Sequence, residues 1–235
     1  MKKYKIAAVS YLNTLPFVYG LNECSAIFDV MLVPPAKCAE MLETDEVDIA
    51  LVPVGALLKF FYIEIVSPYC IGAKGAVNSV FLISNTPLKQ IVKVYCDPHS
   101  YTSNALVKIL SKYYWNCDFS VSTTASYPPL NLEYGEAFVA IGDKTFGLKT
   151  HFNTVVDLSI EWNKFTKKPF VFAVWISKKT LDISIIEQMN LALKFGISNI
   201  KNSISFFNSS FISAEEAIYY LENNIKYNLN KEYIV

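Results

Sequence analysis

The sequence predicts an α/β protein of two lobes, with mixed sheets flanked by helices and a ligand cleft between the lobes. Short runs rich in β-branched and aromatic residues alternate with helical patterns along nearly all of the 235 residues, which is typical of an α/β protein with largely parallel sheets. At 52% hydrophobic residues, the chain can bury a substantial core. Two strand-like runs, 78–84 and 169–177, stand apart from the others, and we interpret them as crossings between lobes.

A chain that crosses twice has a discontinuous first lobe and a continuous second lobe. We therefore assign residues 1–85 and 175–235 to the first lobe and residues 86–174 to the second. Pockets favour domain interfaces, so the ligand is expected between the lobes.

The individual elements follow from local patterns. A helix is expected from Pro35 through residue 42, because proline is tolerated in the first turn. Further helices are expected at 103–114 and 183–197, and Ser213 with Glu216 forms a capping box before 217–221. The expected strands are 4–9, 28–33, 47–52, 79–84, 92–96, 119–122, 137–141 and 170–176.

Charge limits the classes of partner. The chain has 21 basic and 21 acidic residues, so no net field draws it to nucleic acid or to an anionic membrane. All of the basic residues are lysines. Without the guanidinium fork of arginine, an anionic small molecule must be held by lysine, by hydroxyl and amide groups, or by backbone N–H groups.

Cysteine, histidine and glycine patterns argue against metals and cofactors. The five cysteines include no Cys-x-x-Cys pair and are interpreted as reduced core residues. The two histidines have no second ligand at metal spacing, and no glycine-rich phosphate motif is present. We therefore expect neither a metal nor a cofactor.

The start of the chain and its apolar runs indicate a cytoplasmic location. Polar residues interrupt the first apolar run, and no cleavage site of a signal peptide follows it. The longest apolar stretch, 49–58, is far shorter than the ~20 residues that span a bilayer. We expect no membrane segment, and the sequence gives no indication of the oligomeric state.

Polar residues follow the first strand at Ser10, Tyr11 and Asn13. Open α/β sheets bind ligands at the carboxyl ends of their strands, which makes this loop a candidate site. The plainer alternative is that Ser10 and Asn13 only cap a helix.

A second candidate loop, 97–104, follows the expected strand 92–96 and enters a helix. Its Ser100, Thr102 and Ser103, together with the free N–H groups of the helix start, would stabilise a carboxylate. Simple capping is again the alternative.

Two more candidates lie near the expected crossings. Asn78 and Ser79 would face the cleft if the first crossing is real, although a serine at a strand start is often structural. No Gly-x-Ser-x-Gly elbow surrounds Ser79, so a hydrolase nucleophile is not indicated. Asp143 and Lys144 end another strand, where they either reach a ligand or pair with each other.

An ordered set of segments carries a resemblance to a known family. The segments are SYLNTLP (10–16), DIALVPV (48–54), GAVNS (75–79) leading into VFLIS (80–84), SYTS (100–103), IGD (141–143) and KPFVFAVW (168–175). Taken in order, they resemble the chorismate dehydratase family of the futalosine route to menaquinone, over nearly the full chain. Asn13 after Tyr11-Leu12 favours the dehydratase over the naphthoate synthase of the same pathway. The resemblance implies a type II periplasmic-binding-protein-like fold.

The reaction implied by the resemblance is removal of water from chorismate to give 3-[(1-carboxyvinyl)oxy]benzoate, without a cofactor. Such an enzyme is a carbon–oxygen lyase, specifically a hydro-lyase. By resemblance, Asn13 and Ser79 are the catalytic residues at the reacting ring. We expect their removal to change stability little.

The proton acceptor is left open among a substrate carboxylate, a water and Asp143. Relatives often carry arginine at the position of Tyr101, so carboxylate binding passes here to Thr102, Ser103 and backbone donors. The rival functions are a non-catalytic small-anion binding protein of the same fold and the naphthoate synthase. The substrate-binding residues that we predict are Ser10, Tyr11, Asn78, Ser100, Thr102, Ser103 and Asp143.

Overall fold

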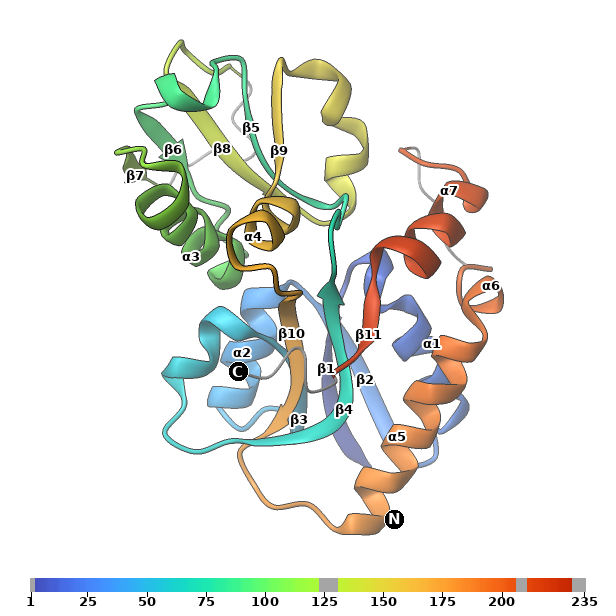
Figure 1. The fold of residues 1–235 in the computed structure, drawn as a ribbon. Helices are drawn as coiled ribbons and strands as arrows, with labels where there is room; N and C mark the ends of the chain where they lie inside the picture. The colour runs from blue at the N-terminus through green and yellow to red at the C-terminus, as the bar shows by residue number, and fades with distance from the viewer. Residues whose placement is uncertain (1–2, 123–130, 206–210, 230–235) are drawn as a thin grey trace.

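The computed structural model describes residues 3–122, 131–205 and 211–229. Within these ranges the strands form one six-stranded and one five-stranded sheet. Each sheet forms the centre of one lobe, and the two lobes are joined by the connections from β4 to β5 and from α4 to β10 (Figure 1). This arrangement confirms the predicted two-lobed α/β class with mixed sheets. The expectation that the sheets are largely parallel is wrong: among the described residues, five of the nine strand pairings are antiparallel, chiefly because β5 and β10 run antiparallel to their neighbours.

The first sheet has the order β11-β4-β10-β3-β1-β2. Its first strand, β1, pairs in parallel with β2 and β3, whereas β10 is antiparallel to both β3 and β4. Its strands are β1 (Tyr4–Val9), β2 (Phe28–Val33), β3 (Ile49–Pro53), β4 (Glu64–Ala73), β10 (Phe170–Ser177) and β11 (Lys226–Asn228).

The second sheet has the order β7-β6-β8-β5-β9. Here β6 is parallel to β7 and β8, and β5 is antiparallel to β8 and β9. Its strands are β5 (Val80–Ser84), β6 (Lys93–Tyr95), β7 (Ser120–Ser122), β8 (Glu136–Ile141) and β9 (Thr154–Asp157).

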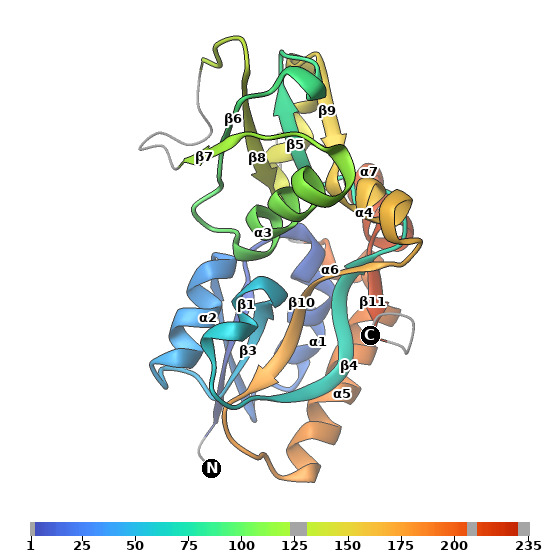
Figure 2. The same cartoon turned by 60° about the vertical axis from the view of Figure 1, so that its left-hand side comes forward.

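Helices flank both sheets. In the first lobe, α1 and α5 pack against one face and α2 lies on the other (Figures 1 and 2). The π-helical turns 111–115 and 220–224 extend α3 and α7. The α-helices are α1 (Leu15–Glu23), α2 (Pro35–Glu43), α3 (Tyr101–Leu110), α4 (Leu158–Thr166), α5 (Ile183–Ser198), α6 (Ile200–Ser203) and α7 (Ala214–Tyr219).

The expected elements are present, and the capping box of Ser213 and Glu216 is formed. The sequence analysis missed β4, β9, β11, α4 and α6, and it gave no bounds for α1. In β4 the cause is Pro68, since proline inside a run argues against a strand. In the structure Pro68 lies at an irregularity of the sheet, because the register of the β4–β10 pairing shifts between Ile65 and Cys70.

Sheet membership differs in detail from the expected lobe boundaries. Strand β5 pairs in the second sheet although residues 80–84 were assigned to the first lobe, and β10 pairs in the first sheet although most of it was assigned to the second. The chain thus changes sheets between Ala73 and Val80 and again between Asp157 and Phe170. The division at 85/86 and 174/175 stays a prediction.

Two glycines set the distance between α1 and α5. A Cβ atom on Gly196 would lie 1.7 Å from the backbone oxygen of Pro16, and one on Gly20 would lie 1.9 Å from that of Ala192. Real Cβ atoms do not approach backbone this closely, so the helices can pack at this distance only with glycine at both positions.

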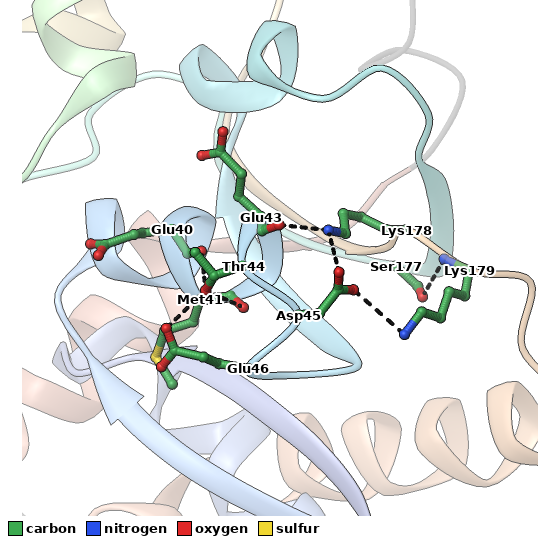
Figure 3. Close-up of polar contacts among 9 residues, drawn as sticks. All are labelled: Glu40, Met41, Glu43, Thr44, Asp45, Glu46, Ser177, Lys178 and Lys179. Carbon is green, nitrogen blue, oxygen red and sulfur yellow. Dashed lines mark hydrogen bonds and ion pairs between the residues drawn. The ribbon is translucent and has the colours of Figure 1, made fainter.

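The turn that follows α2 is fastened to the end of β10 (Figure 3). Asp45 has a left-handed φ of 59°, and its carboxylate lies 3.1 Å from Nζ of Lys178 and 3.5 Å from Nζ of Lys179. These lysines hold the pKa of Asp45 below its usual value. Because Asp45 is exposed, the ion pairs add little stability.

The cysteines are all free thiols, and Cys38, Cys70 and Cys96 are buried. Burial raises the pKa of Cys38 to about 12. This placement agrees with the interpretation of the cysteines as core residues.

Candidate active site

A narrow cavity of about 60 Å³ lies between the two lobes. It is bounded by loops that follow strands of both sheets, by the start of α3 and by β10. Its lining includes Tyr11, Asn13, Ser79, Ser100, Thr102 and Ser103, which the sequence analysis drew from three separate stretches. The apolar part of the lining consists of Val9, Pro35, Pro53, Ile71, Val77, Val80, Ile141, Phe172 and Ala173.

Asn13 lies in a short 3₁₀ helix, Leu12–Thr14, directly after β1. Its side-chain oxygen accepts a hydrogen bond from Oγ1 of Thr14 at 3.2 Å. Its backbone oxygen accepts one from the hydroxyl of Tyr227 at 3.0 Å. The loop is therefore held on both sides, and the Asn13 amide is fixed at the cavity wall.

Ser79 ends the connection from β4 to β5 and is only 2% exposed. Its Oγ lies 2.7 Å from the hydroxyl oxygen of Tyr220, and its backbone oxygen accepts a hydrogen bond from the N–H of Gly142 at 3.0 Å. Ser79 thus lines the cavity, while its hydroxyl is hydrogen-bonded to a buried tyrosine.

At the start of α3, Ser100 is the N-cap and accepts a hydrogen bond from the N–H of Ser103 at 3.1 Å. Within the described residues the Ser103 hydroxyl has no hydrogen-bond partner, so it is open to a ligand. Thr102 is different. Its Oγ1 accepts from the N–H of Gly55 at 3.0 Å and donates to the oxygen of Phe172 at 3.2 Å, so its proton is already used in joining the lobes.

The loop before α3 is rigid because Asp97 organises it. This side chain is fully buried, accepts from the N–H of His99 at 2.8 Å and pairs with Nζ of Lys144 at 3.0 Å. Lys144 therefore pairs with Asp97, whereas the sequence analysis left open whether Asp143 and Lys144 reach a ligand or pair with each other.

Three predicted site residues lie outside the cavity lining: Ser10, Asn78 and Asp143. Ser10 is exposed. Asn78 adopts a left-handed φ of 58°, and its N–H donates to Asp157 at 2.8 Å. Both carboxylate oxygens of Asp143 accept from the N–H of Leu12, at 3.0 and 3.1 Å. In this structure, Asn78 and Asp143 hold backbone segments around the cavity.

Gly142 allows Tyr11 to reach the cavity wall. The φ of Gly142 is 72°, and a Cβ atom there would lie 2.7 Å from the Tyr11 ring. Burial, followed by the nearby Asp97 and Asp143 carboxylates, raises the pKa of Tyr11. Tyr11 therefore presents a neutral phenol to the cavity.

Burial raises the pKa of Asp143 from 3.8 to about 6, although the hydrogen bond from Leu12 acts in the opposite direction. Since the folded state binds the proton more tightly, stability should fall as the pH rises from about 4 to 6. Asp143→Asn keeps an acceptor for Leu12 and removes the buried charge. We expect it to raise the free energy of unfolding at pH 7 by ~1–3 kcal/mol and to change it little at pH 3.5.

Urea unfolding of both proteins at several pH values measures this difference. Comparing the two proteins is necessary because burial also raises the pKa of Asp157, which adds its own pH dependence to each curve. The prediction would be contradicted if the difference in unfolding free energy between Asp143→Asn and the wild type stayed the same from pH 3.5 to 7.

The sequence analysis missed two tyrosines beside the site. Tyr220 and Tyr227 are 4% and 6% exposed, and their hydroxyls contact Ser79 and Asn13 respectively. The sequence placed residue 220 on the apolar stripe of a capped helix, and no local pattern distinguished its hydroxyl from a core aromatic. Each tyrosine is more than 140 residues from its partner in the sequence, and only folding brings Tyr220 to Ser79 and Tyr227 to Asn13.

Among the described residues, no group of three or more His, Cys, Asp or Glu side chains could hold a metal ion. No helix in the same part of the chain is long and apolar enough to cross a bilayer.

Known structures define the class of the fold. A protein of Archaeoglobus fulgidus matches with a TM-score of 0.73 at 14% identity, covering 98% of this chain and 92% of its own. A Candida albicans protein described as having the generic periplasmic binding protein fold matches with a TM-score of 0.68 at 12% identity, covering 97% and 83%. Two lobes with a cavity between them thus define a periplasmic-binding-protein-like protein.

Sequence comparison then gives the family. The family model described as menaquinone biosynthesis matches residues 4–234, so the chain belongs to that family. The chorismate dehydratase of Thermus thermophilus is 26% identical over 200 residues, which are 76% of this chain and 71% of the relative. These findings confirm the family resemblance and the assignment to menaquinone biosynthesis.

Proposed function

We propose that the protein is a chorismate dehydratase of the futalosine route, which converts chorismate to 3-[(1-carboxyvinyl)oxy]benzoate and water. The observation that carries the proposal is that Asn13 and Ser79 line one cavity in a member of the menaquinone biosynthesis family. The relative named chorismate dehydratase supports it.

The chemistry requires positioned polar groups more than a strong acid or base. A proton leaves the ring carbon that bears the enol ether, and hydroxide leaves the neighbouring carbon. The electron pair of the broken C–H bond becomes part of the aromatic ring. Because aromatisation drives the reaction, the protein needs to orient the substrate and to stabilise the departing hydroxyl.

In this proposal the hydroxyl of Ser79 and the amide of Asn13 donate hydrogen bonds where negative charge develops. Neither is a base at neutral pH. Asp143 is a poor candidate for the base, because it lies outside the lining and both of its oxygens accept from Leu12. We therefore favour a carboxylate of the substrate, or a water, as the proton acceptor.

Substrate carboxylates are proposed to bind at the start of α3. The described residues that line the cavity include no lysine, so the negative charge must be balanced by hydrogen bonds. Ser103, with its open hydroxyl, and the helix N-terminus meet this need. The cavity is small for such a ligand, and we expect the lobes to separate when it enters.

The experiment that tests the proposal is incubation of the purified protein with chorismate, followed by ultraviolet absorbance and mass measurement of the product. We expect loss of one water and activity that survives a chelator. Binding without turnover would favour the small-anion receptor instead, and unchanged chorismate would leave the naphthoate synthase as the alternative. The cytoplasmic location and the absence of a cofactor stay predictions.

A further inference from the structure

Tyr220 lies directly behind the two proposed catalytic residues. It begins the π-helical turn Tyr220–Asn224 after α7, is 4% exposed and does not line the cavity. Its hydroxyl lies 2.7 Å from Oγ of Ser79, and the side chain of Asn13 is a further polar neighbour that acts to lower the pKa of Tyr220. Residues from three distant parts of the chain therefore lie around one phenol group.

The ring of Tyr220 is held in place as firmly as its hydroxyl. Phe146, from the second lobe, packs edge-on against it, with ring centroids 5.2 Å apart and planes at 81°. With the ring fixed by packing and the oxygen fixed by two polar neighbours, only the direction of the hydrogen bonds remains to be assigned.

The relative acidity of the two hydroxyl groups assigns that direction. At 2.7 Å either oxygen could be the donor. A phenol is a stronger acid than the aliphatic hydroxyl of serine, so the Tyr220 proton is the one donated to Oγ of Ser79. Ser79 then keeps its own proton free, and Ser79 lines the cavity.

Burial and neighbouring charges keep Tyr220 protonated. Burial raises the pKa of Tyr220 far above its usual value, and the carboxylates of Asp143 and Asp157 raise it further, whereas the polar contacts with Ser79 and Asn13 act in the opposite direction. The buried Tyr227 is a further neighbour, and burial raises its pKa as well. Tyr220 therefore stays neutral and keeps its proton to donate.

We propose that Tyr220 is a positioning residue that makes Ser79 a hydrogen-bond donor toward the substrate, through the hydrogen bond from its phenol to Oγ of Ser79. The inference rests on the proposed function, since it gives Ser79 the task of stabilising the departing hydroxyl. Without the phenol proton, Ser79 would be free to turn its own proton toward Tyr220 or away from the cavity.

The test is Tyr220→Phe, which keeps the packing against Phe146 and removes only the hydroxyl. We expect kcat for chorismate to fall roughly 10-fold to 100-fold, less than for loss of a direct contact, while KM changes less than about 2-fold. Tyr95→Phe is the matched control, because it removes a tyrosine hydroxyl that contacts Glu136 in the second sheet. The control should leave kcat unchanged.

A double variant separates positioning from a merely structural role. If Tyr220 acts through Ser79, then Tyr220→Phe should change kcat less than about 3-fold in a Ser79→Ala background. A full loss in both backgrounds, or wild-type kcat for Tyr220→Phe alone, would overturn the inference. Wild-type protein that leaves chorismate unchanged would instead refute the proposed function, so the two failures are distinguishable.

Should Tyr220→Phe not fold, proton NMR of the wild-type protein tests the same point. The phenol proton of Tyr220 should exchange slowly with water and lie close to the β-protons of Ser79. A Ser79 hydroxyl proton that points to the phenol oxygen would overturn the assignment.

Discussion

Ser79→Ala is expected to lower kcat for chorismate by on the order of 100-fold to 1000-fold, the usual effect of removing one hydrogen bond made in the transition state. Ser79 lines the cavity, and its contact with Tyr220 holds the hydroxyl in place before the substrate arrives. KM should change far less, because the effect falls on the reaction step. Steady-state kinetics with chorismate measures both constants.

The matched control is Ser84→Ala, a second buried serine, at the far end of β5. Its hydroxyl donates to the oxygen of Glu136 at 2.6 Å and is remote from the cavity lining. Both variants should lose about 1 kcal/mol of unfolding free energy, but only Ser79→Ala should lose turnover. Equal kcat values for the two variants would contradict the assignment of Ser79.

The structure revises one expectation about Ser79. The sequence suggests that its removal changes stability little, as for a serine at a cleft surface. Ser79 is in fact 2% exposed and bonded to Tyr220, so its removal leaves a buried phenol with one partner fewer. A modest loss of stability is therefore expected beside the large loss of kcat.

Gly196→Ala is expected to have the largest effect on stability, a loss of about 3 kcal/mol or more. Alanine is the better helix former by about 1 kcal/mol, so without a clash the variant would be more stable. The new Cβ would, however, lie 1.7 Å from the backbone oxygen of Pro16, and α1 would have to move. Urea unfolding followed by circular dichroism measures the balance of the two effects.

Ser198→Ala, two residues further along α5 and exposed, is the control and should change the free energy of unfolding by less than about 0.5 kcal/mol. Insoluble Gly196→Ala protein beside soluble Ser198→Ala protein would support the same conclusion. If Gly196→Ala had the same urea midpoint of unfolding as the wild type, α1 and α5 would not be held at the close distance seen in the structure.

Local patterns predicted the parts of the fold that local physics decides. The bounds of β1 and β2 agree with the expected runs, because period and β-branched content indicate such strands directly. Strand β11 is only three residues long, and its place beside β4 depends on contacts made after the chain has folded. The pattern of three residues does not indicate which distant strand they will pair with.

The candidate site shows the same division. Asn13 could be proposed as a site residue because it follows the first strand, and Ser79 because it lies at an expected crossing between lobes. Their catalytic roles were proposed from the family resemblance. The Thr102 hydroxyl is hydrogen-bonded to Gly55 and Phe172, and Tyr220 supports Ser79. These contacts form only when the two lobes come together. Contacts between such distant segments do not produce a characteristic residue spacing in the sequence, so they could not be predicted from it.

The most direct measurement of the central claim is a proton NMR time course of chorismate with wild-type protein and with Ser79→Ala. The account predicts that wild-type protein converts the ring signals of chorismate into those of a 1,3-disubstituted benzoate in equal amount, with the enol ether retained. Ser79→Ala should give the same product far more slowly. Chorismate that persists with folded wild-type protein, or equal rates for the two proteins, would contradict the account.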